Sequence, residues 1–253
     1  MSFTGDQLTQ DDFLGGAITI WQPKNGYRAA TDPVFLAAAV KAKAGQSVLE
    51  LGCGAGTALA CLCKRVAGLE AHGLEIQADY ADLARRNAAD NGLEFTVHDG
   101  DLLDMQDPIC TASFDHVFTN PPFFEASASS PPSDAGRDTA HRIGEAQLRD
   151  WIAVGLRRLK PKGYFTIIHR AEQLADILAA LDGKAGDVRI LPLCAREGRA
   201  AGRVIVRARK GAAGALKLLA PLILHTGTAH SKDEDSFRPD VRNILRNTQP
   251  IVM

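Results

Sequence analysis

The residues with the clearest chemical potential are Asn120-Pro121-Pro122-Phe123, which follow the apolar segment Ser113–Thr119. A proline fixes its own φ at about −65°, and a residue before proline is pushed into extended geometry, so Asn120 is held stiffly. Its side-chain amide supplies an acceptor and a donor, and Phe123 supplies a flat apolar face beside it. This combination suits a planar group that carries NH2, such as adenine or a glutamine amide. A proline-rich turn that merely ends a strand is the alternative, which only the rest of the chain can decide.

A second set of chemically active residues surrounds a glycine-rich turn. The apolar segment Val48–Leu51 predicts a strand, and Gly52, Gly54 and Gly56 follow it before a helical segment. Glycine is needed where backbone turns sharply or approaches a ligand, and such a turn binds ligands at the carboxyl edge of a sheet. Glu75 comes 23 residues after Gly52, where a doubly wound fold presents a carboxylate to ribose hydroxyls.

Two cofactors fit this turn. A dinucleotide such as NAD carries a pyrophosphate, which a G-x-G-x-x-G turn at a helix N-terminus accommodates. Here the pattern is Glu50-x-Gly52-x-Gly54-x-Gly56, with an acid on the preceding strand. An acid there favours a ligand that bears an ammonium over one that bears phosphates. The pattern therefore favours S-adenosylmethionine (SAM) over NAD.

Strands and helices alternate along the chain, which predicts an α/β fold with a mainly parallel sheet covered on both faces. The predicted strands are Ser47–Leu51, Ala71–Glu75, Phe95–His98, Phe114–Thr119, Tyr164–His169, Val188–Leu193 and Arg203–Arg209. The predicted helices are Pro33–Ala42, Thr57–Val66, Gln77–Asn91, Ala146–Leu159 and Ala171–Leu181. Segment Glu125–Asp138 is rich in Ser, Ala and Pro and predicts a loop, either a plain solvent loop or a lid over the substrate. The tail His230–Met253 opens with a charged run and is expected to be partly disordered.

Length and composition favour a single domain. The 253 residues are 45% apolar and 23% charged, which are ordinary globular values. The longest apolar stretches are too short for a membrane span, and the first residues lack a signal-peptide pattern, so we expect a cytoplasmic protein. The five cysteines form no C-x-x-C pair, so we expect reduced thiols and no metal site.

The order of these motifs resembles that of the class I SAM-dependent methyltransferases acting on exocyclic or amide nitrogens. The motifs are Glu50-x-Gly-x-Gly-x-Gly, Glu75, Asp99-Gly100-Asp101 and Asn120-Pro-Pro-Phe123. The likeness implies a Rossmann-like fold with a seven-stranded sheet. Towards both ends of the chain the resemblance is to a more specific family, the bacterial tRNA1(Val) adenine-37 N6-methyltransferases. The segments that resemble this family are Gln22–Arg28, Thr31-Asp32, Ile168–Arg170, Arg196–Val206 and Leu224-His225.

The resemblance implies a role for each site residue. Gly52, Gly54 and Gly56 would shape the methionine pocket, with Glu50 near the ammonium. The ribose hydroxyls would bind Glu75, and the cofactor's adenine amine would bind Asp101. The residues that would help close the pocket are Gly26, Tyr27, Arg28 and Asp32. The residues of transfer would be Asn120, Pro121, Pro122 and Phe123, with Asn120 and the Pro121 carbonyl accepting hydrogen bonds from the reacting amine and Phe123 stacking on a flipped-out base.

The same resemblance divides the chain into three parts. Residues 1–46 would be an N-terminal element that closes the cofactor and substrate pocket, and residues 47–225 the methyltransferase domain. Residues 226–253 form a tail to which no function is carried over.

The N-P-P-[FY] motif also serves enzymes that methylate a glutamine in release factors, which carry an extra helical domain before the SAM fold. Only about 46 residues precede the first predicted strand here. The segment 184–217 carries nine Lys or Arg against two acids, while the whole chain has a net charge of −1. A local basic segment suits phosphates, although a solubilising surface is the alternative.

We therefore predict an RNA adenine, most simply in tRNA, as the target, with Arg196, Arg199 and Arg203 as RNA contacts. A protein glutamine and a non-catalytic SAM-binding RNA partner remain as alternatives. A DNA adenine is disfavoured because no separate target-recognition domain is evident. Which RNA, which adenine and which oligomeric state apply are not specified by the sequence.

Overall fold

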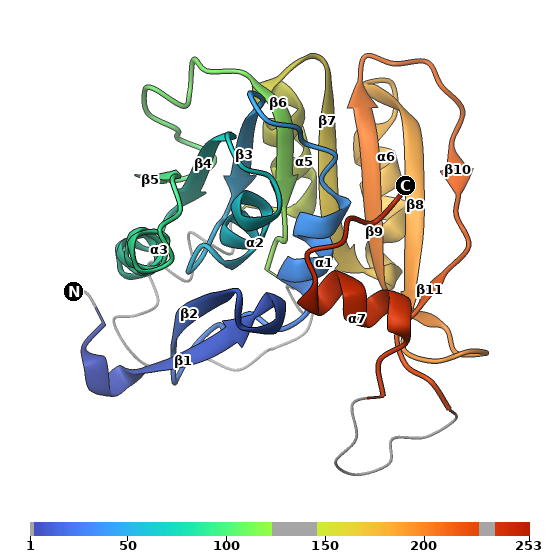
Figure 1. Ribbon diagram of the computed structural model, residues 1–253. Coiled ribbons are helices and arrows are strands. Elements are labelled where there is room, and N and C mark those ends of the chain that lie inside the picture. Colours follow the sequence, from blue (N-terminus) through green and yellow to red (C-terminus); the bar gives the residue numbers. More distant parts are fainter. Residues whose placement is uncertain (1–2, 123–145, 228–235) are drawn as a thin grey trace, which may run out of the picture.

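One mixed sheet organises the fold (Figure 1). The computed structural model describes residues 3–122, 146–227 and 236–253. The sheet's strands are β3 (Ser47–Leu51), β4 (Glu70–Glu75), β5 (Thr96–Asp99), β6 (Phe114–Thr119), β7 (Leu159–Arg170), β8 (Ala185–Cys194), β9 (Ala201–Lys210), β10 (Lys217–Leu218) and β11 (Leu222–Ile223). Their order is β10-β8-β9-β7-β6-β3-β4-β5, and β11 also pairs with β8. Within the described residues the pairings are parallel, except that β9 runs antiparallel to β7 and β8.

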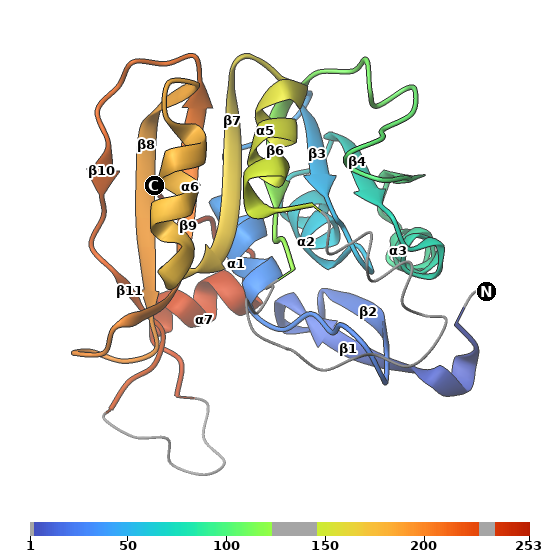
Figure 2. The same ribbon diagram turned by 180° about the vertical axis from the view of Figure 1, so that it is seen from behind.

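Helices cover both faces of this sheet. One face carries α1 (Asp32–Ala39), α2 (Thr57–Arg65) and α7 (Pro239–Arg246), with α3 (Ala78–Asp90) near the β5 end (Figure 1). The other face carries α5 (Leu148–Arg158) and α6 (Leu174–Leu181), which Figure 2 shows from behind. Within the described residues there are also three short 3₁₀ helices: η1 (Gly5–Gln7), η2 (Leu14–Gly16) and η3 (Ala171–Gln173). No helix within the described residues is long and apolar enough to cross a membrane.

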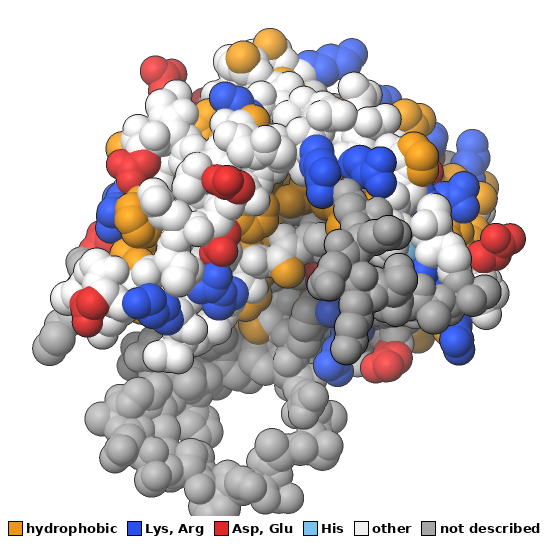
Figure 3. Space-filling model, turned by 60° about the horizontal axis from the view of Figure 1, so that its bottom comes forward, with side chains coloured by type: hydrophobic (Ala, Val, Ile, Leu, Met, Phe, Trp, Pro, Cys, Tyr) orange, Lys and Arg blue, Asp and Glu red, His pale blue; other side chains and the backbone are white. Residues whose placement is uncertain are grey.

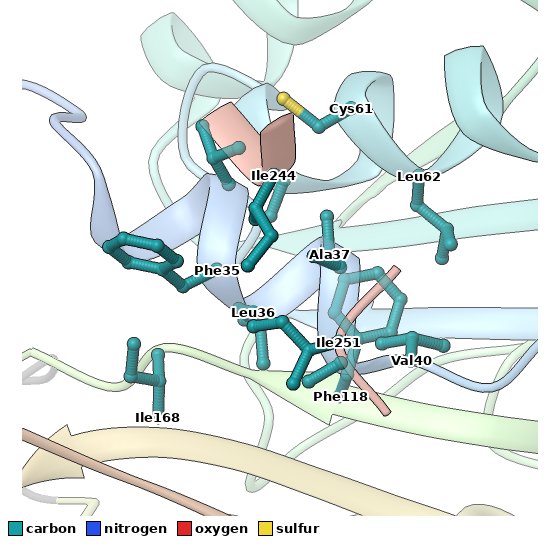
Figure 4. Close-up of a cluster of buried hydrophobic side chains, with 14 of the residues drawn as sticks. Phe35, Leu36, Ala37, Val40, Cys61, Leu62, Phe118, Ile168, Ile244 and Ile251 are labelled. Carbon is teal, nitrogen blue, oxygen red and sulfur yellow. The ribbon is translucent and has the colours of Figure 1, made fainter. Parts of the chain in front are cut away.

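Helix α1 lies in the centre of the hydrophobic core. Its residues Pro33–Ala39 are all buried, as expected for a helix that is apolar on every side. Proline is compatible with the first turn, where its missing N–H is not needed. Figure 4 shows α1 side chains, including Phe35 and Leu36, beside Phe118 of β6 and Ile244 of α7. The same core cluster contains Ile251 and Met253.

The end of the chain is therefore part of the core. Partial disorder was expected for the tail, yet in its described part Val241 and Ile244 of α7 are buried, as are Ile251 and Met253. The short helix escaped prediction because only two of its eight residues are fully buried, and the others except Leu245 are polar or exposed. Residues 228–235 lie outside the described part of the chain, as do Phe123 and the expected loop Glu125–Asp138.

The N-terminal region forms a hairpin that the sequence pattern did not predict. Strands β1 (Leu8–Phe13) and β2 (Ile18–Pro23) pair only with each other, and Figure 1 shows them beneath the main sheet. Two asparagines of the α3 region hydrogen-bond to β2 with both the carbonyl oxygen and the NH2 of their side-chain amides. Asn87 accepts from the Trp21 N–H at 2.8 Å and donates to the Trp21 carbonyl at 3.1 Å. Asn91 makes the same pair of bonds with Thr19, both at 2.8 Å.

The predicted fold class is confirmed, and all seven predicted strands are present. Ser47–Leu51 and Phe114–Thr119 match β3 and β6 at both ends, while β7 begins five residues earlier than predicted. Residues Lys160–Gly163, which lie between the predicted helix and strand, belong to β7, and the register with β6 shifts in this part of the strand. The sheet exceeds seven strands because β10 and β11 add two residues each at its edge.

Candidate functional site

The strand order reverses between β3 and β6, and the main cavity lies at the carboxyl ends of these strands. Glu50 of β3 is in register with Phe118 of β6, and Leu51 with Thr119. The next residues on each strand, Gly52 and Asn120, are therefore brought to the same edge. Both line a cavity of about 300 Å³. Ligands of open α/β sheets bind at such switch points, and the volume is at the lower end for a small-molecule site.

Glu50 is the most unusual acid in this cavity. It is 3% exposed, and its Oε2 has no hydrogen-bond partner among the described residues. Burial raises the pKa of the Glu50 carboxyl well above its ordinary value of 4.5, and the charge of Glu75 adds to the shift. A buried carboxylate without a partner is costly. Its position on the cavity wall therefore favours a ligand that carries a cation.

Glu75, at the end of β4, accepts hydrogen bonds from the backbone of two segments that line the cavity. Its Oε2 accepts from the Gly54 N–H at 2.8 Å and its Oε1 from the Gln77 N–H at 2.9 Å. Burial raises the pKa of the Glu75 carboxyl, and these two backbone bonds oppose the rise. Asp101, after β5, also lines the cavity and accepts from the Leu103 N–H at 2.8 Å.

The charges around the cavity fit SAM. Three acids, Glu50, Glu75 and Asp101, line it, and no Lys or Arg does so among the described residues. A pyrophosphate would meet net negative charge here, whereas an ammonium and a sulfonium meet the opposite charge. The wall residues therefore fit a cationic nucleoside cofactor and not a dinucleotide.

The glycines of the turn meet different neighbours. A Cβ on Gly52, whose φ is +66°, would lie 2.7 Å from the indole ring of Trp151. A Cβ on Gly54 would lie 3.8 Å from the ring of Tyr27. Gly56 precedes α2 and does not line the cavity. Its missing side chain leaves room for Ala84 and Phe95 instead.

Asn120 is placed to act at the mouth of the cavity. Its Oδ1 is buried without a hydrogen-bond partner among the described residues, while its Nδ2 lies 3.4 Å from the Tyr27 hydroxyl. Pro121 is buried and Pro122 exposed, and both line the cavity. The expected stacking residue Phe123 lies outside the described residues.

The expected pocket-closing residues divide into two groups. Tyr27 lines the cavity, whereas Gly26, Arg28 and Asp32 do not. A Cβ on Gly26 would lie 2.8 Å from the Tyr80 hydroxyl. Arg28 supports the hairpin by donating to Thr9, Pro23 and Asp11. Asp32 accepts from Arg203 Nε at 2.9 Å, so two residues predicted to bind different ligands are paired with each other.

The basic segment 184–217 does not form one patch. In the β8–β9 hairpin, Ala185 pairs with Lys210 at one end and Cys194 with Ala201 at the other. Arg203 pairs with Arg170 at the carboxyl end of β7, so the loop carrying Arg196 and Arg199 lies at the same edge as Asn120. The residues at the opposite end are Lys184, Arg209 and Lys210.

The three expected RNA-binding arginines differ in availability. Arg199 is exposed. Arg196 is 9% exposed and donates to the carbonyls of Thr226 and Gly227, which makes it a structural residue of the loop. Arg203 is partly exposed and bonded to Asp32. Figure 3 views this side of the molecule and shows both basic and acidic side chains around a hollow with apolar side chains.

Trp151, Thr57 and Gln22 are among the cavity residues that were not identified from the sequence. Trp151 of α5 and Thr57 of α2 are buried, and each has a polar atom without a hydrogen-bond partner among the described residues: Trp151 Nε1 and Thr57 Oγ1. Gln22 is buried between the cavity and Ala29, whose backbone it bonds at both N–H and carbonyl. Thr57 follows the glycine turn directly, which was an available signal, but a Trp on a core-facing helix gives none.

Comparison with known proteins agrees with this geometry. The family model of the methyltransferase small domain matches residues 30–191. The tRNA1(Val) (adenine(37)-N6)-methyltransferase of Porphyromonas gingivalis W83 is 29% identical over 179 residues, covering 65% of this chain and 69% of that protein. The enzyme of the same name from Yersinia enterocolitica is 29% identical, covering 66% and 69%.

Solved structures show the same fold. The predicted O-methyltransferase Atu636 from Agrobacterium tumefaciens has a TM-score of 0.68 at 25% identity and covers 87% of this chain and 98% of its own. The Thermus thermophilus 16S rRNA N2 G1207 methyltransferase, solved with AdoMet and guanosine, has a TM-score of 0.57 at 20% identity, covering 80% and 50%. With the switch-point cavity and its acids, these matches establish that the chain belongs to the methyltransferase small domain family, the class I methyltransferases that use S-adenosylmethionine.

Proposed function

We propose that this methyltransferase modifies the exocyclic N6 of an adenine in RNA, with tRNA as the favoured substrate. The observation that carries the proposal is the Asn120 carbonyl oxygen, which is buried at the cavity without a partner among the described residues. Such an acceptor needs a donor from a ligand, and an exocyclic amine supplies one. The names of the relatives from P. gingivalis and Y. enterocolitica, which specify an adenine N6 of tRNA, support the same chemistry.

The residues that would hold SAM are the three acids of the cavity. Glu50 would face the ammonium, Glu75 the ribose hydroxyls and Asp101 the adenine amine. When bound, SAM supplies an electrophilic methyl group. The buried carboxylate of Glu50 would gain the cation that the described residues do not give it, which offsets the cost of its burial.

Asn120 would act on the nucleophile. The lone pair of an aromatic amine is delocalised into the ring, so the amine must be oriented before it attacks. Hydrogen bonds from the N6 hydrogens to Asn120 Oδ1 and the Pro121 carbonyl would direct that lone pair and stabilise the positive charge that develops on nitrogen. The proton becomes acidic only as the new bond forms, so positioning supplies much of the acceleration and no strong base is needed first.

The position of Arg199 favours RNA over a protein glutamine. Arg199 is exposed on the β8–β9 loop, at the same edge of the sheet as Asn120. Arginine binds phosphate oxygens without regard to base identity and would hold the RNA backbone beside the site. A protein loop that presents a glutamine carries no phosphates, so an arginine at this edge would not be required to bind it.

The test is methyl transfer from radiolabelled SAM to total tRNA, rRNA and release factors in parallel, followed by mass spectrometry of the nucleosides. We expect label in tRNA and N6-methyladenosine in the digest. Label in the release factor would replace the proposal with glutamine methylation. SAM binding without transfer to any of the three would instead indicate a non-catalytic RNA partner.

A further inference from the structure

Tyr27 lines the cavity together with Asn120 and the three acids Glu50, Glu75 and Asp101. Its hydroxyl lies 3.4 Å from Asn120 Nδ2, and its ring lies over Gly54 of the glycine turn. The residue is 54% exposed overall, so the ring is at the cavity mouth while the hydroxyl is turned inward. No other described side chain bonds the Asn120 amide.

The backbone that carries Tyr27 is fixed on both sides. The Tyr80 hydroxyl donates to the Tyr27 carbonyl at 3.1 Å. On the other side, Gln22 accepts from the Ala29 N–H at 2.6 Å and Arg28 donates to the Pro23 carbonyl at 2.9 Å. These bonds come from β2, α3 and the segment itself, so the Tyr27 hydroxyl occupies a defined place relative to β6.

The Tyr27 hydroxyl is protonated and accepts a hydrogen bond from Asn120. Burial of the hydroxyl, followed by the negative charges of Glu50 and Asp32, raises the pKa of Tyr27 to about 12, so the hydroxyl keeps its proton at neutral pH. A neutral phenol oxygen still has lone pairs, and here it accepts from Asn120 Nδ2 at 3.4 Å.

An amide that donates on one side presents its oxygen on the other. With Nδ2 directed to Tyr27, Asn120 Oδ1 is the atom left without a partner among the described residues. The reverse orientation would present NH2 to an incoming amine, and two donors cannot bond. The orientation of one amide therefore decides whether the site accepts an amine.

We propose that Tyr27 is a positioning residue that holds the Asn120 amide with its oxygen toward the target amine. This inference rests on the proposed function, because it assumes that an amine is the group methylated. It gives Tyr27 a task in the transfer step that is distinct from closing the cofactor pocket.

The experiment compares Tyr27→Phe with Tyr27→Leu, with Tyr164→Phe as the matched control. Tyr27→Phe removes only the hydroxyl, so we expect kcat for RNA methylation to fall roughly tenfold. The SAM Kd, the KM for RNA and the melting temperature should stay unchanged. Tyr27→Leu should lower kcat to the same extent. Tyr164 lies on β7 in register with His116, away from the cavity, and its variant should retain full activity.

Other outcomes would overturn the proposal. Normal kcat in Tyr27→Phe with a raised KM in Tyr27→Leu would mean that the ring stacks on the base. A weakened SAM Kd in Tyr27→Phe would mean that the hydroxyl serves the cofactor.

A second measurement does not depend on turnover. The side-chain amide resonances of Asn120, assigned by their absence in Asn120→Asp, should shift in Tyr27→Phe. An unchanged amide signal would contradict the contact even if activity changed. If the wild-type protein methylated no RNA, the proposed function would fail, while this signal would still report on the Tyr27–Asn120 contact.

Discussion

The carboxyl edge of the sheet has two regions of opposite character. At β3 and β4 the cavity is lined by buried or partly buried acids, and no Lys or Arg lines it among the described residues. At β7, β8 and β9 the same edge carries Arg170, Arg199 and Arg203. Asn120, on β6, lies between the two regions in the strand order.

With this division of charge, one edge of the sheet can bind two ligands of opposite charge. A cationic cofactor is attracted to the acidic region, and an anionic polymer is attracted to the basic region, so neither competes for the other's position. The basic region is less simple than its composition suggests, because Arg196 is buried and Arg203 is bonded to Asp32. The exposed Arg199 therefore carries more of the proposed RNA contact than its two neighbours.

The largest effect is expected at the boundary between the regions. Asn120→Ala should lower kcat by about 10²- to 10³-fold, the usual cost of removing a group that stabilises charge in the transition state. The SAM Kd should be nearly unchanged, since the role proposed for Asn120 is to orient the nucleophile and not to bind the cofactor. Steady-state methylation and calorimetric SAM titration would check both. If Asn120→Ala weakened SAM binding by as much as it lowered kcat, Asn120 would contribute to the cofactor site as well as to the substrate site.

Glu50→Gln sharpens the acidic side of the comparison. The amide keeps the shape but loses the charge, so SAM binding should weaken by about 2 kcal/mol, the typical value of a hydrogen bond to a charged group. The SAM-free protein should be no less stable than the wild type, because a buried acid with one oxygen unpartnered among the described residues is replaced by a neutral group. SAM titration and thermal unfolding would check the pair. A marked drop in melting temperature would show that Glu50 supports the fold instead.

The same acid predicts a dependence of SAM binding on pH. Because burial raises the pKa of Glu50, the free protein holds a proton there at pH values where an exposed Glu is ionised. An ammonium favours the carboxylate, so binding releases the proton, and SAM affinity should rise with pH, by at most about tenfold per unit, until the raised pKa is passed. The SAM-free protein should lose stability over the same range above pH 4.5, because the unfolded carboxyl gives up its proton first. Titrations at several pH values would check the slope, which Glu50→Gln should reduce.

The smallest effect is expected on the basic side. Arg199→Gln should weaken RNA binding a few-fold and reduce the salt slope of log Kd by about one, as for the loss of one phosphate contact. Arg209→Gln is the matched control, since Arg209 lies at the opposite end of the β8–β9 hairpin. SAM affinity should be unaffected in both. If both variants weakened RNA binding equally, RNA contact would not be specific to the end of the hairpin that carries Arg199.

Local patterns predicted the elements that hold the cofactor, because they are continuous in sequence. An apolar strand, a glycine turn and the helix that follows it are local features, and β3 was predicted to the residue. The hairpin was missed because β1 has mixed burial and a polar sequence, and its partner surface is supplied by α3 and not by the main sheet.

Contacts between distant segments could not be predicted from local pattern. Asp32 and Arg203 are 171 residues apart, and each was assigned to a different ligand. Trp151 follows β6 by more than thirty residues and has the burial of any core helix residue, yet its ring occupies the space that a side chain on Gly52 would need. Only the folded chain shows that the two residues of each pair are in contact.

The bonds of Asn87 and Asn91 to β2 have an energetic consequence for cofactor binding. Each asparagine bonds the backbone N–H and C=O of a single residue of the hairpin through its carbonyl and its NH2, as a neighbouring strand would. The wall that carries Gln22 and leads to Tyr27 is therefore ordered before any ligand arrives. Because this wall is already ordered, cofactor binding carries no conformational-entropy cost for ordering it. The binding free energy of the cofactor is therefore not reduced by that cost.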